Sequence, residues 1–190
     1  MSVKRIPDHD FYEYYKIFSN AYPHSGWSGS EDDIQRYIQD RIDIQHGDQG
    51  GGYYGCYRDG KLRGVMRVME NRMRVLSRTL TAGCLGAVAV DLFHRKEKVA
   101  MDLMDGFFQQ CRQQNIHFGA LHAFRPDFYK QMGWGYGAKL SKYRLKIAAL
   151  PQGSTKENVR FLNKQDRDAF QACYLRYFEQ THGLLEKLDN

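Results

Sequence analysis

The sequence has no long hydrophobic run and few of the residues that cross-link small proteins. Its first residues, "MSVKRIPDHDFYEYY", lack the apolar core of a signal peptide, and no stretch approaches the roughly 18 apolar residues of a membrane span. The seven histidines show no ligand-like spacing, so no metal site is expected. The four cysteines lack C-x-x-C spacing, which argues against a disulfide framework or zinc and favours core thiols in a reducing cytoplasm: Cys56, Cys84, Cys111 and Cys173.

The composition is that of a soluble globular protein with its own core. The chain has 190 residues, of which 42% are hydrophobic and 14% aromatic. Residues 1–50 hold 5 Lys/Arg against 9 Asp/Glu, whereas residues 51–150 hold 17 against 7. This segregation suggests an anionic ligand near the basic segment and a cationic one near the acidic segment. Two differently charged solvated surfaces, or a basic nucleic-acid binder, are the alternatives.

The periodicity predicts two helices followed by a hairpin. Apolar residues recur at helical spacing in residues 11–23 and again in residues 31–45. Ser30, with Asp33 three residues later, approximates a capping box for the second of these helices. The spacing then changes to two in residues 53–75, where Asp59-Gly60 predicts a tight turn.

The rest of the first unit alternates strands with helices. Residues 84–90, "CLGAVAV", are continuously apolar, as in a strand buried on both faces, and residues 95–115 have a helical pattern. A short strand, a proline-opened helical turn and an alternating run over 137–150 follow. The predicted order is α-α-β-β-β-α-β-α-β, an α+β fold around one mixed sheet.

The last forty residues do not fit this unit. Residues 151–158 have the composition of a linker, and residues 159–183 begin again with a strand-like run and an amphipathic helix. We therefore expect one domain over 1–150, and over 151–190 a linker with the start of a second, truncated domain.

A basic turn between a strand and a helix is the first candidate site. No glycine occurs between Val88 and Met104, yet a strand ending at Val90 and a helix beginning near Arg95 leave free backbone N–H groups. The basic residues of the turn add positive charge there. The turn is either a phosphate site or an ordinary charged helix start.

A second motif favours the phosphate site. Taken together, "VAV…RKEKVA…FYKQMGWGYG" resembles the GNAT N-acetyltransferase superfamily over residues 3–146. The stretches "FSNAYP", "HRK" and "FYKQMGWGYGA" are similar to the enhanced-intracellular-survival (Eis-like) branch. The resemblance implies a mostly antiparallel mixed sheet flanked by helices, acetyl-CoA as acetyl donor without a metal, a second GNAT-like domain, and a hexamer.

The resemblance assigns the donor site residue by residue. Val88, Ala89 and Val90 would offer main-chain groups to the pantetheine arm, and Phe124 and Arg125 would lie beside the thioester. Lys98 stands where the family usually has glycine, and we expect it to adopt helical dihedrals with its side chain turned outward. The residues implied around the pyrophosphate are Arg95, Lys96, Glu97, Lys98, Val99, Ala100 and Met101.

The resemblance also implies an acyltransferase reaction in which a primary amine attacks the thioester in a ternary complex. Tyr129 aligns with the tyrosine that protonates the leaving sulfur. The base would be the C-terminal carboxylate of a longer chain or, failing that, Glu70. An acidic pocket from the first helices would accept a cationic amine. The alternatives are a catalytically silent acyl-CoA-binding module and a nucleic-acid-binding domain.

Overall fold

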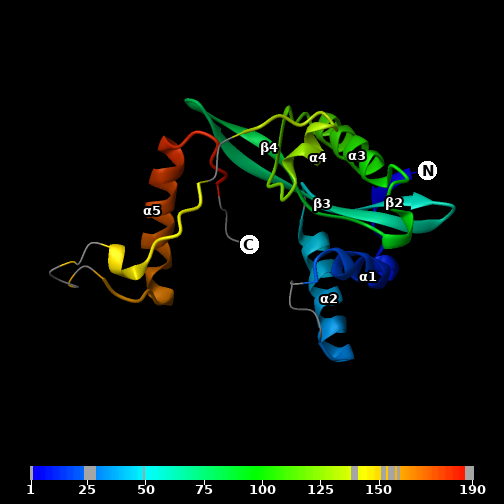
Figure 1. Cartoon of the computed structure of the whole chain (residues 1–190), viewed down its shortest axis with the longest axis horizontal. Helices are drawn as coiled ribbons and strands as arrows, with labels where there is room; N and C mark the ends of the chain where they lie inside the picture. Colours follow the sequence, from blue (N-terminus) through cyan, green and yellow to red (C-terminus); the bar gives the residue numbers. More distant parts are fainter. Residues whose placement is uncertain are drawn as a thin grey trace.

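The computed structural model describes residues 2–23, 29–48, 50–137, 141–150, 153, 157 and 159–186. A five-stranded sheet forms the centre of the molecule, and helices cover both of its faces (Figure 1). Of the predicted elements, the two N-terminal helices, the hairpin, the apolar strand and the helix after it are present in the predicted order.

The strands lie in the sheet in chain order. Neighbouring strands are antiparallel except for the last pair, which is parallel, so the predicted mixed and mostly antiparallel α+β fold is confirmed. The parallel pair needs a crossover, and the helix between the two strands supplies it. The strands are β1 (Ser2–Arg5), β2 (Gly52–Arg58), β3 (Lys61–Val75), β4 (Arg78–Val90) and β5 (Phe118–Leu121).

Helices α1 (Phe11–Ala21) and α2 (Glu31–Gly47) cover one face of the sheet. The capping box at the start of α2 is confirmed, because Ser30 and Asp33 exchange both side-chain-to-backbone hydrogen bonds. The core on this face is largely aromatic. Tyr14 packs edge-to-face on Tyr53 with ring centroids 5.1 Å apart.

Helices α3 (Val99–Gln113) and α4 (Pro126–Lys130) lie on the opposite face. Leu103 and Phe107, which α3 directs into the core, are fully buried. Trp134, just after α4, stacks on Phe107 with centroids 5.5 Å apart. This contact fixes the start of the chain beyond α4 against α3.

The predicted hairpin turn is confirmed between β2 and β3. Asp59 and Gly60 both have positive φ, at 51° and 72°. Consecutive left-handed residues match the twist of the flanking strands, and aspartate and glycine tolerate that conformation best.

The observed secondary structure differs from the predicted one in three places. Strand β1 was not predicted, because its four residues form a short edge strand with little alternation. Residues 141–146 form no strand although their side chains alternate, and residues 138–140 lie outside the described part of the chain. Residues 159–163 are likewise exposed and form no strand. Alternation of side chains does not form a strand where no neighbouring backbone is available for hydrogen bonding.

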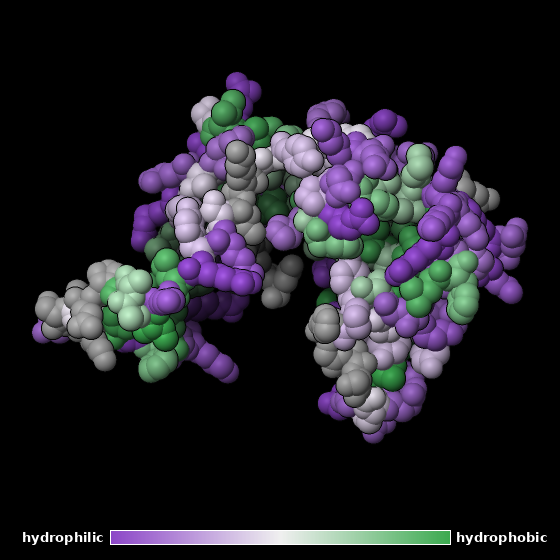
Figure 2. All heavy atoms as spheres, in the orientation of Figure 1, coloured by the Kyte–Doolittle hydropathy of each residue, from purple (hydrophilic) through white to green (hydrophobic). Residues whose placement is uncertain are grey.

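The C-terminal segment contacts the sheet through the far end of β3. Helix α5 (Arg167–Gln180) lies apart from α1 and α2, and the chain after it runs beside the β3–β4 hairpin (Figure 1). There the Arg74 amide donates to the Leu184 carbonyl at 2.9 Å. Figure 2 shows hydrophobic residues on the surface of the C-terminal segment. Phe161, in this segment, is 98% exposed. Cys173 on α5 is exposed, whereas the other three cysteines are buried as expected.

Candidate functional site

The site is built around a bulge in β4. Val65 of β3 pairs with Ala89, but Arg67 pairs with Gly86, so β4 contains one residue more than β3 in this interval. Ala87, inside the bulge, has φ 51°. A bulge of this kind bends its strand and interrupts the hydrogen-bonding ladder.

The bend coincides with the end of the β4–β5 pairing. Within the described residues, β5 pairs with β4 only from Ala82 to Leu85. The continuation of β4 over residues 86–90 therefore lies beyond its parallel neighbour. Val88, Ala89 and Val90, the residues predicted for the pantetheine arm, all belong to this continuation. A strand edge without a neighbour can hydrogen-bond an extended ligand.

The basic turn follows directly. Residues 95–98 form turns, and α3 begins at Val99. Lys96 and Lys98 have φ of 67° and 63°, so both are left-handed. The prediction that Lys98 takes helical dihedrals is wrong. The physical reason is that the chain must reverse between the 3-10 helix at Leu92–His94 and α3, and this reversal needs the conformation that glycine adopts most easily.

The start of α3 has the properties of an anion site. Lys98 occupies the N-cap without any side-chain capping hydrogen bond, which leaves the first N–H groups of the helix uncapped. Arg95, Lys96 and Lys98 are exposed, and no ion pair with another described side chain engages them. The predicted residues Ala100 and Met101 lie in the first turn of this helix. Positive charge and free N–H groups together attract a phosphate.

Arg58, at the end of β2, contacts the basic turn and fixes its backbone. The sequence did not indicate this role. The Arg58 guanidinium donates to the Glu97 carbonyl at 2.8 Å and pairs with the Asp102 carboxylate on α3. Glu97, the one acidic residue of the turn, also lies 3.2 Å from the His94 ring through its carboxylate. The acidic charge of the turn is thus occupied by protein partners, while its lysines and arginine are not.

The second predicted motif, with the two predicted residues before it, contains α4. Phe124 and Arg125 are exposed residues between β5 and α4, and Arg125 pairs with Asp127 at 3.1 Å. Tyr129, on α4, is only 7% exposed and belongs to the same apolar cluster as Val88 and Val90. Tyr129 thus belongs to the core cluster against which the edge of β4 packs.

The electrostatics around Tyr129 keep its phenol neutral. Burial, with a smaller contribution from the neighbouring Tyr22, raises the pKa of Tyr129 to about 12. Burial also raises the pKa of Tyr22. Both hydroxyls therefore carry their protons at neutral pH and can donate hydrogen bonds. Tyr22, too, was not indicated by the sequence.

The fallback base is not placed at this site. Glu70 pairs across the ladder with Gly83, five residues before Val88 in β4, and its side chain lies against Gly50. At about 3.3 Å per residue, that separation is roughly 16 Å along the strand. The acidic residues predicted for an acceptor pocket are exposed on α2: Glu31, Asp32, Asp40 and Asp43.

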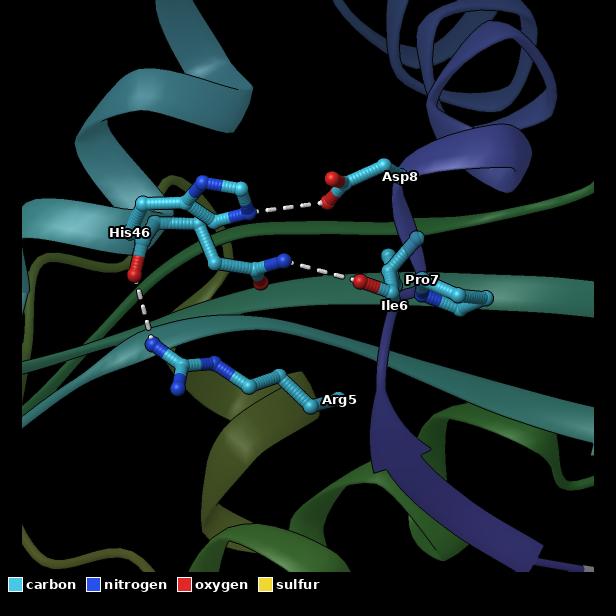
Figure 3. Close-up of a pocket in the computed structure, with 6 residues that line it drawn as sticks. Arg5, Ile6, Pro7, Asp8 and His46 are labelled. Atoms are coloured by element: carbon cyan, nitrogen blue, oxygen red, sulfur yellow. Dashed lines mark hydrogen bonds and ion pairs between the residues drawn. The ribbon is translucent and has the colours of Figure 1, made fainter.

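The hollows of the surface lie elsewhere. One, of about 440 Å³, lies between β1 and the end of α2 (Figure 3). There the His46 ring lies 3.1 Å from the Asp8 carboxylate, and the buried Gln45 amide donates to the Ile6 carbonyl at 2.8 Å. Arg5 donates to the Gln45 carbonyl at 2.7 Å. These groups satisfy one another, which identifies a structural junction between α2 and the sheet.

Two negative findings concern the described part of the chain. Among its residues, no group of three His, Cys, Asp or Glu side chains is arranged to hold a metal ion. None of its helices combines the length and apolarity that crossing a membrane would require.

A mixed sheet whose open strand edge leads into a basic, uncapped helix start defines a domain suited to an extended, phosphorylated ligand. Residues 2–137 match the family model described as the acetyltransferase (GNAT) domain, and the chain belongs to this family. Membership supports acyl transfer as the general class of activity. Comparison with curated protein sequences gives no match.

Solved structures share the fold. Glucosamine-6-phosphate N-acetyltransferase from Arabidopsis thaliana is 16% identical with a TM-score of 0.58, covering 75% of this chain and 97% of that one. An aminoglycoside 6′-N-acetyltransferase from Acinetobacter haemolyticus is 16% identical with a TM-score of 0.57, covering 77% and 99%. A probable N-acyltransferase from Enterococcus faecalis is 17% identical with a TM-score of 0.54. The match covers 68% of the present chain but only 31% of the longer Enterococcus protein.

Proposed function

We propose that the protein is an acetyl-CoA-dependent N-acetyltransferase that moves the acetyl group to a primary amine in a ternary complex. The observation that carries this proposal is the continuity of the β4 edge with the start of α3. An extended donor lying along residues 88–90 would present its pyrophosphate to the N–H groups of Val99, Ala100 and Met101. Three exposed cations lie at the same place, and Tyr129 lies beside the edge.

The reaction needs few groups from the protein. The amine nitrogen attacks the thioester carbonyl, a C–N bond forms, and the C–S bond breaks to release a thiolate. The amine loses one proton, and the thiolate gains one. We propose Tyr129 as the group that serves the thiolate. An ordinary thiol has a pKa of about 8.5, whereas that of Tyr129 is about 12.

This difference refines the role of Tyr129 as general acid. Complete transfer of its proton to a thiolate would be uphill by about 5 kcal/mol. The phenol therefore stabilises the developing thiolate mainly as a strong hydrogen-bond donor, and the sulfur acquires its proton as the product leaves. Such donation strengthens as charge develops on sulfur, so it acts on the transition state more than on the bound donor.

The acceptor is proposed only as a chemical class. The exposed carboxylates of α2 favour a cationic amine. Two structural neighbours are a glucosamine-6-phosphate N-acetyltransferase and an aminoglycoside 6′-N-acetyltransferase, and amines of these two kinds are candidate acceptors here. A panel that includes an amino sugar, an aminoglycoside, a lysine peptide and a polyamine covers this class.

The finer family assignment belongs to the same proposal. We place the chain in the Eis-like branch, with residues 151–190 as a linker and the start of a second domain, and with a hexamer as the assembly. In this arrangement the C-terminal carboxylate of a longer chain serves as base. Glu70, the alternative base, lies far along the strand from the bulge, which supports this assignment. Sequencing the coding region beyond codon 190 tests this part, and a stop codon there would contradict it.

A silent acyl-CoA-binding module is the second candidate, and the conformation of Lys98 is the observation that favours it. A side chain at a left-handed position beside the pyrophosphate keeps the backbone farther from the ligand than glycine would. This candidate binds acetyl-CoA but releases no thiol when amines are added.

Two measurements separate these functions. Saturating acetyl-CoA, at about 100 times Kd, stabilises the native state by about 2.7 kcal/mol, which corresponds to a rise in Tm of about 5–10 °C for a chain of this size. Thiol release with the amine panel then reports turnover. No change in Tm would contradict both candidates, and a Tm shift with RNA alone would favour nucleic-acid binding.

The variant Tyr129→Phe tests this role. Loss of a hydrogen-bond donor to the charge that develops in the transition state lowers kcat by about 100-fold or more, while the Kd for acetyl-CoA stays unchanged because the ring is retained. The matched control is Tyr136→Phe, since Tyr136 lies seven residues later and is 71% exposed. Equal turnover by the two variants would remove Tyr129 from the mechanism.

A further inference from the structure

Tyr22 is held rigidly at the end of α1. Its amide donates to the Phe18 carbonyl at 2.9 Å, and Pro23 ends the helix immediately after it. The Tyr22 ring stacks on Phe18 with centroids 4.7 Å apart, and Phe18 stacks in turn on the buried Tyr14 at 5.8 Å. A column of three rings therefore connects Tyr22 to the core, which limits the movement of its hydroxyl.

The hydroxyl of Tyr22 reaches the bulge of β4. It donates to the Val88 carbonyl at 3.1 Å, across 66 positions of sequence. Val88 follows the left-handed Ala87, and neither residue has a partner in the β3 register. The Tyr22 hydroxyl thus holds the Val88 carbonyl at a point where the β3–β4 register is interrupted.

The same hydroxyl is electrostatically coupled to the phenol of Tyr129. The Tyr22 phenol contributes to the raised pKa of Tyr129, which places the two side chains within electrostatic reach of each other. Tyr22 comes from the α1 layer and Tyr129 from α4 on the opposite face. The two phenols therefore approach the β4 edge from opposite sides of the sheet.

We propose that Tyr22 is a positioning residue for the acyl donor, because its hydroxyl fixes the Val88 carbonyl in the orientation that accepts an amide N–H of the donor. This inference rests on the proposed function. A carbonyl oxygen has two lone pairs, so it can accept from Tyr22 and from the donor at the same time. Removing the hydroxyl leaves the carbonyl free to turn toward water, and the donor must then order it on binding.

The variant Tyr22→Phe isolates this effect, since it keeps the ring stack and removes one oxygen atom. The expected result is a rise of about five-fold in the KM for acetyl-CoA, the size of one ordinary hydrogen bond. The kcat and the KM for the amine stay within two-fold. The matched control is Tyr12→Phe, on the same helix and 45% exposed, for which no constant changes.

The experiment combines steady-state kinetics with calorimetric titration of acetyl-CoA and hydrogen exchange of residues 86–90. Faster exchange of these amides in free Tyr22→Phe, together with weaker binding, supports the inference. Unchanged binding and exchange in Tyr22→Phe, with an active parent protein, would overturn the inference and leave the proposed function intact. A fall in kcat at constant KM would also overturn it, because that is the behaviour of a catalytic group. If the parent protein binds no acetyl-CoA, the proposed function fails, and the inference fails with it.

Discussion

Replacement of Lys98 by glycine tests the structural reading of the basic turn. Lys98 has φ 63° and ψ 14°, a left-handed conformation in which a Cβ is crowded by the following carbonyl. This crowding costs about 1–2 kcal/mol for an L-residue. Glycine avoids it, but its more flexible unfolded chain offsets about 0.5–1 kcal/mol of the gain. The net expectation for Lys98→Gly is a free energy of unfolding that rises by about 0.5–1 kcal/mol.

The charge of the lysine must be separated from its backbone. Lys98→Ala removes the ammonium group and keeps the Cβ, so its stability should stay close to that of the parent protein. The difference between Lys98→Gly and Lys98→Ala therefore reports the backbone alone. Urea denaturation at constant pH measures both variants, and the slope of the unfolding free energy with urea should not change between them.

Binding provides a second comparison within the same pair. Both variants lose one positive charge beside the proposed pyrophosphate, so both should bind acetyl-CoA with a weaker dependence on salt. Lys98→Gly should bind more tightly than Lys98→Ala, because the backbone can then approach the ligand more closely. A glycine variant that is no more stable than the alanine variant would refute the left-handed assignment of Lys98, and the argument about backbone approach with it.

Three further predictions concern the surroundings of the site. Arg58→Ala should weaken acetyl-CoA binding by about three- to ten-fold, since it removes the hydrogen bond that holds the Glu97 carbonyl; calorimetry showing unchanged affinity would contradict this. Phe107→Ala should lower the free energy of unfolding by about 3–5 kcal/mol, because Phe107 is completely buried; a loss below 1 kcal/mol in urea denaturation would show that α3 does not depend on this ring. The raised pKa of Tyr129 predicts stability that is present below pH 10, where the phenol is protonated in both states, and lost as pH rises toward 12. Between pH 9 and pH 11 the parent protein should lose about 1.4 kcal/mol relative to Tyr129→Phe, whereas parallel pH curves for the two proteins would contradict the shift.

Local signals in the sequence predicted much of the fold. Ser30 and Asp33 form the expected capping box, and Asp59-Gly60 forms the expected turn, because in both cases short-range chemistry decides the structure. The strand β1 lacked such a signal. It is held by its register with β2, from Ser2 opposite Tyr57 to Arg5 opposite Tyr54, and a partner distant in sequence is not visible in a four-residue stretch.

Some features of the candidate site were likewise indicated by the sequence, and others were not. The placement of Tyr129 near Val88 follows from the order of the elements, and the sequence indicated both residues. The hydrogen bond from Tyr22 depends on the bulge at Ala87, where β4 carries one extra residue. The left-handed conformation of Lys98 depends on the chain reversal between the 3-10 helix and α3. Neither lysine nor alanine carries a sequence signal for positive φ, so these features become visible only in three dimensions.

We propose that acetyl-CoA lies along the open edge of β4 with its pyrophosphate at the start of α3. Hydrogen exchange with and without saturating acetyl-CoA tests it directly, because the proposed contacts are made by backbone amides. The predicted result is slower exchange for residues 86–90 and 98–101, with no comparable change in the hollow beside His46. Binding without protection of either segment, or with protection confined to another part of the chain, would contradict the account.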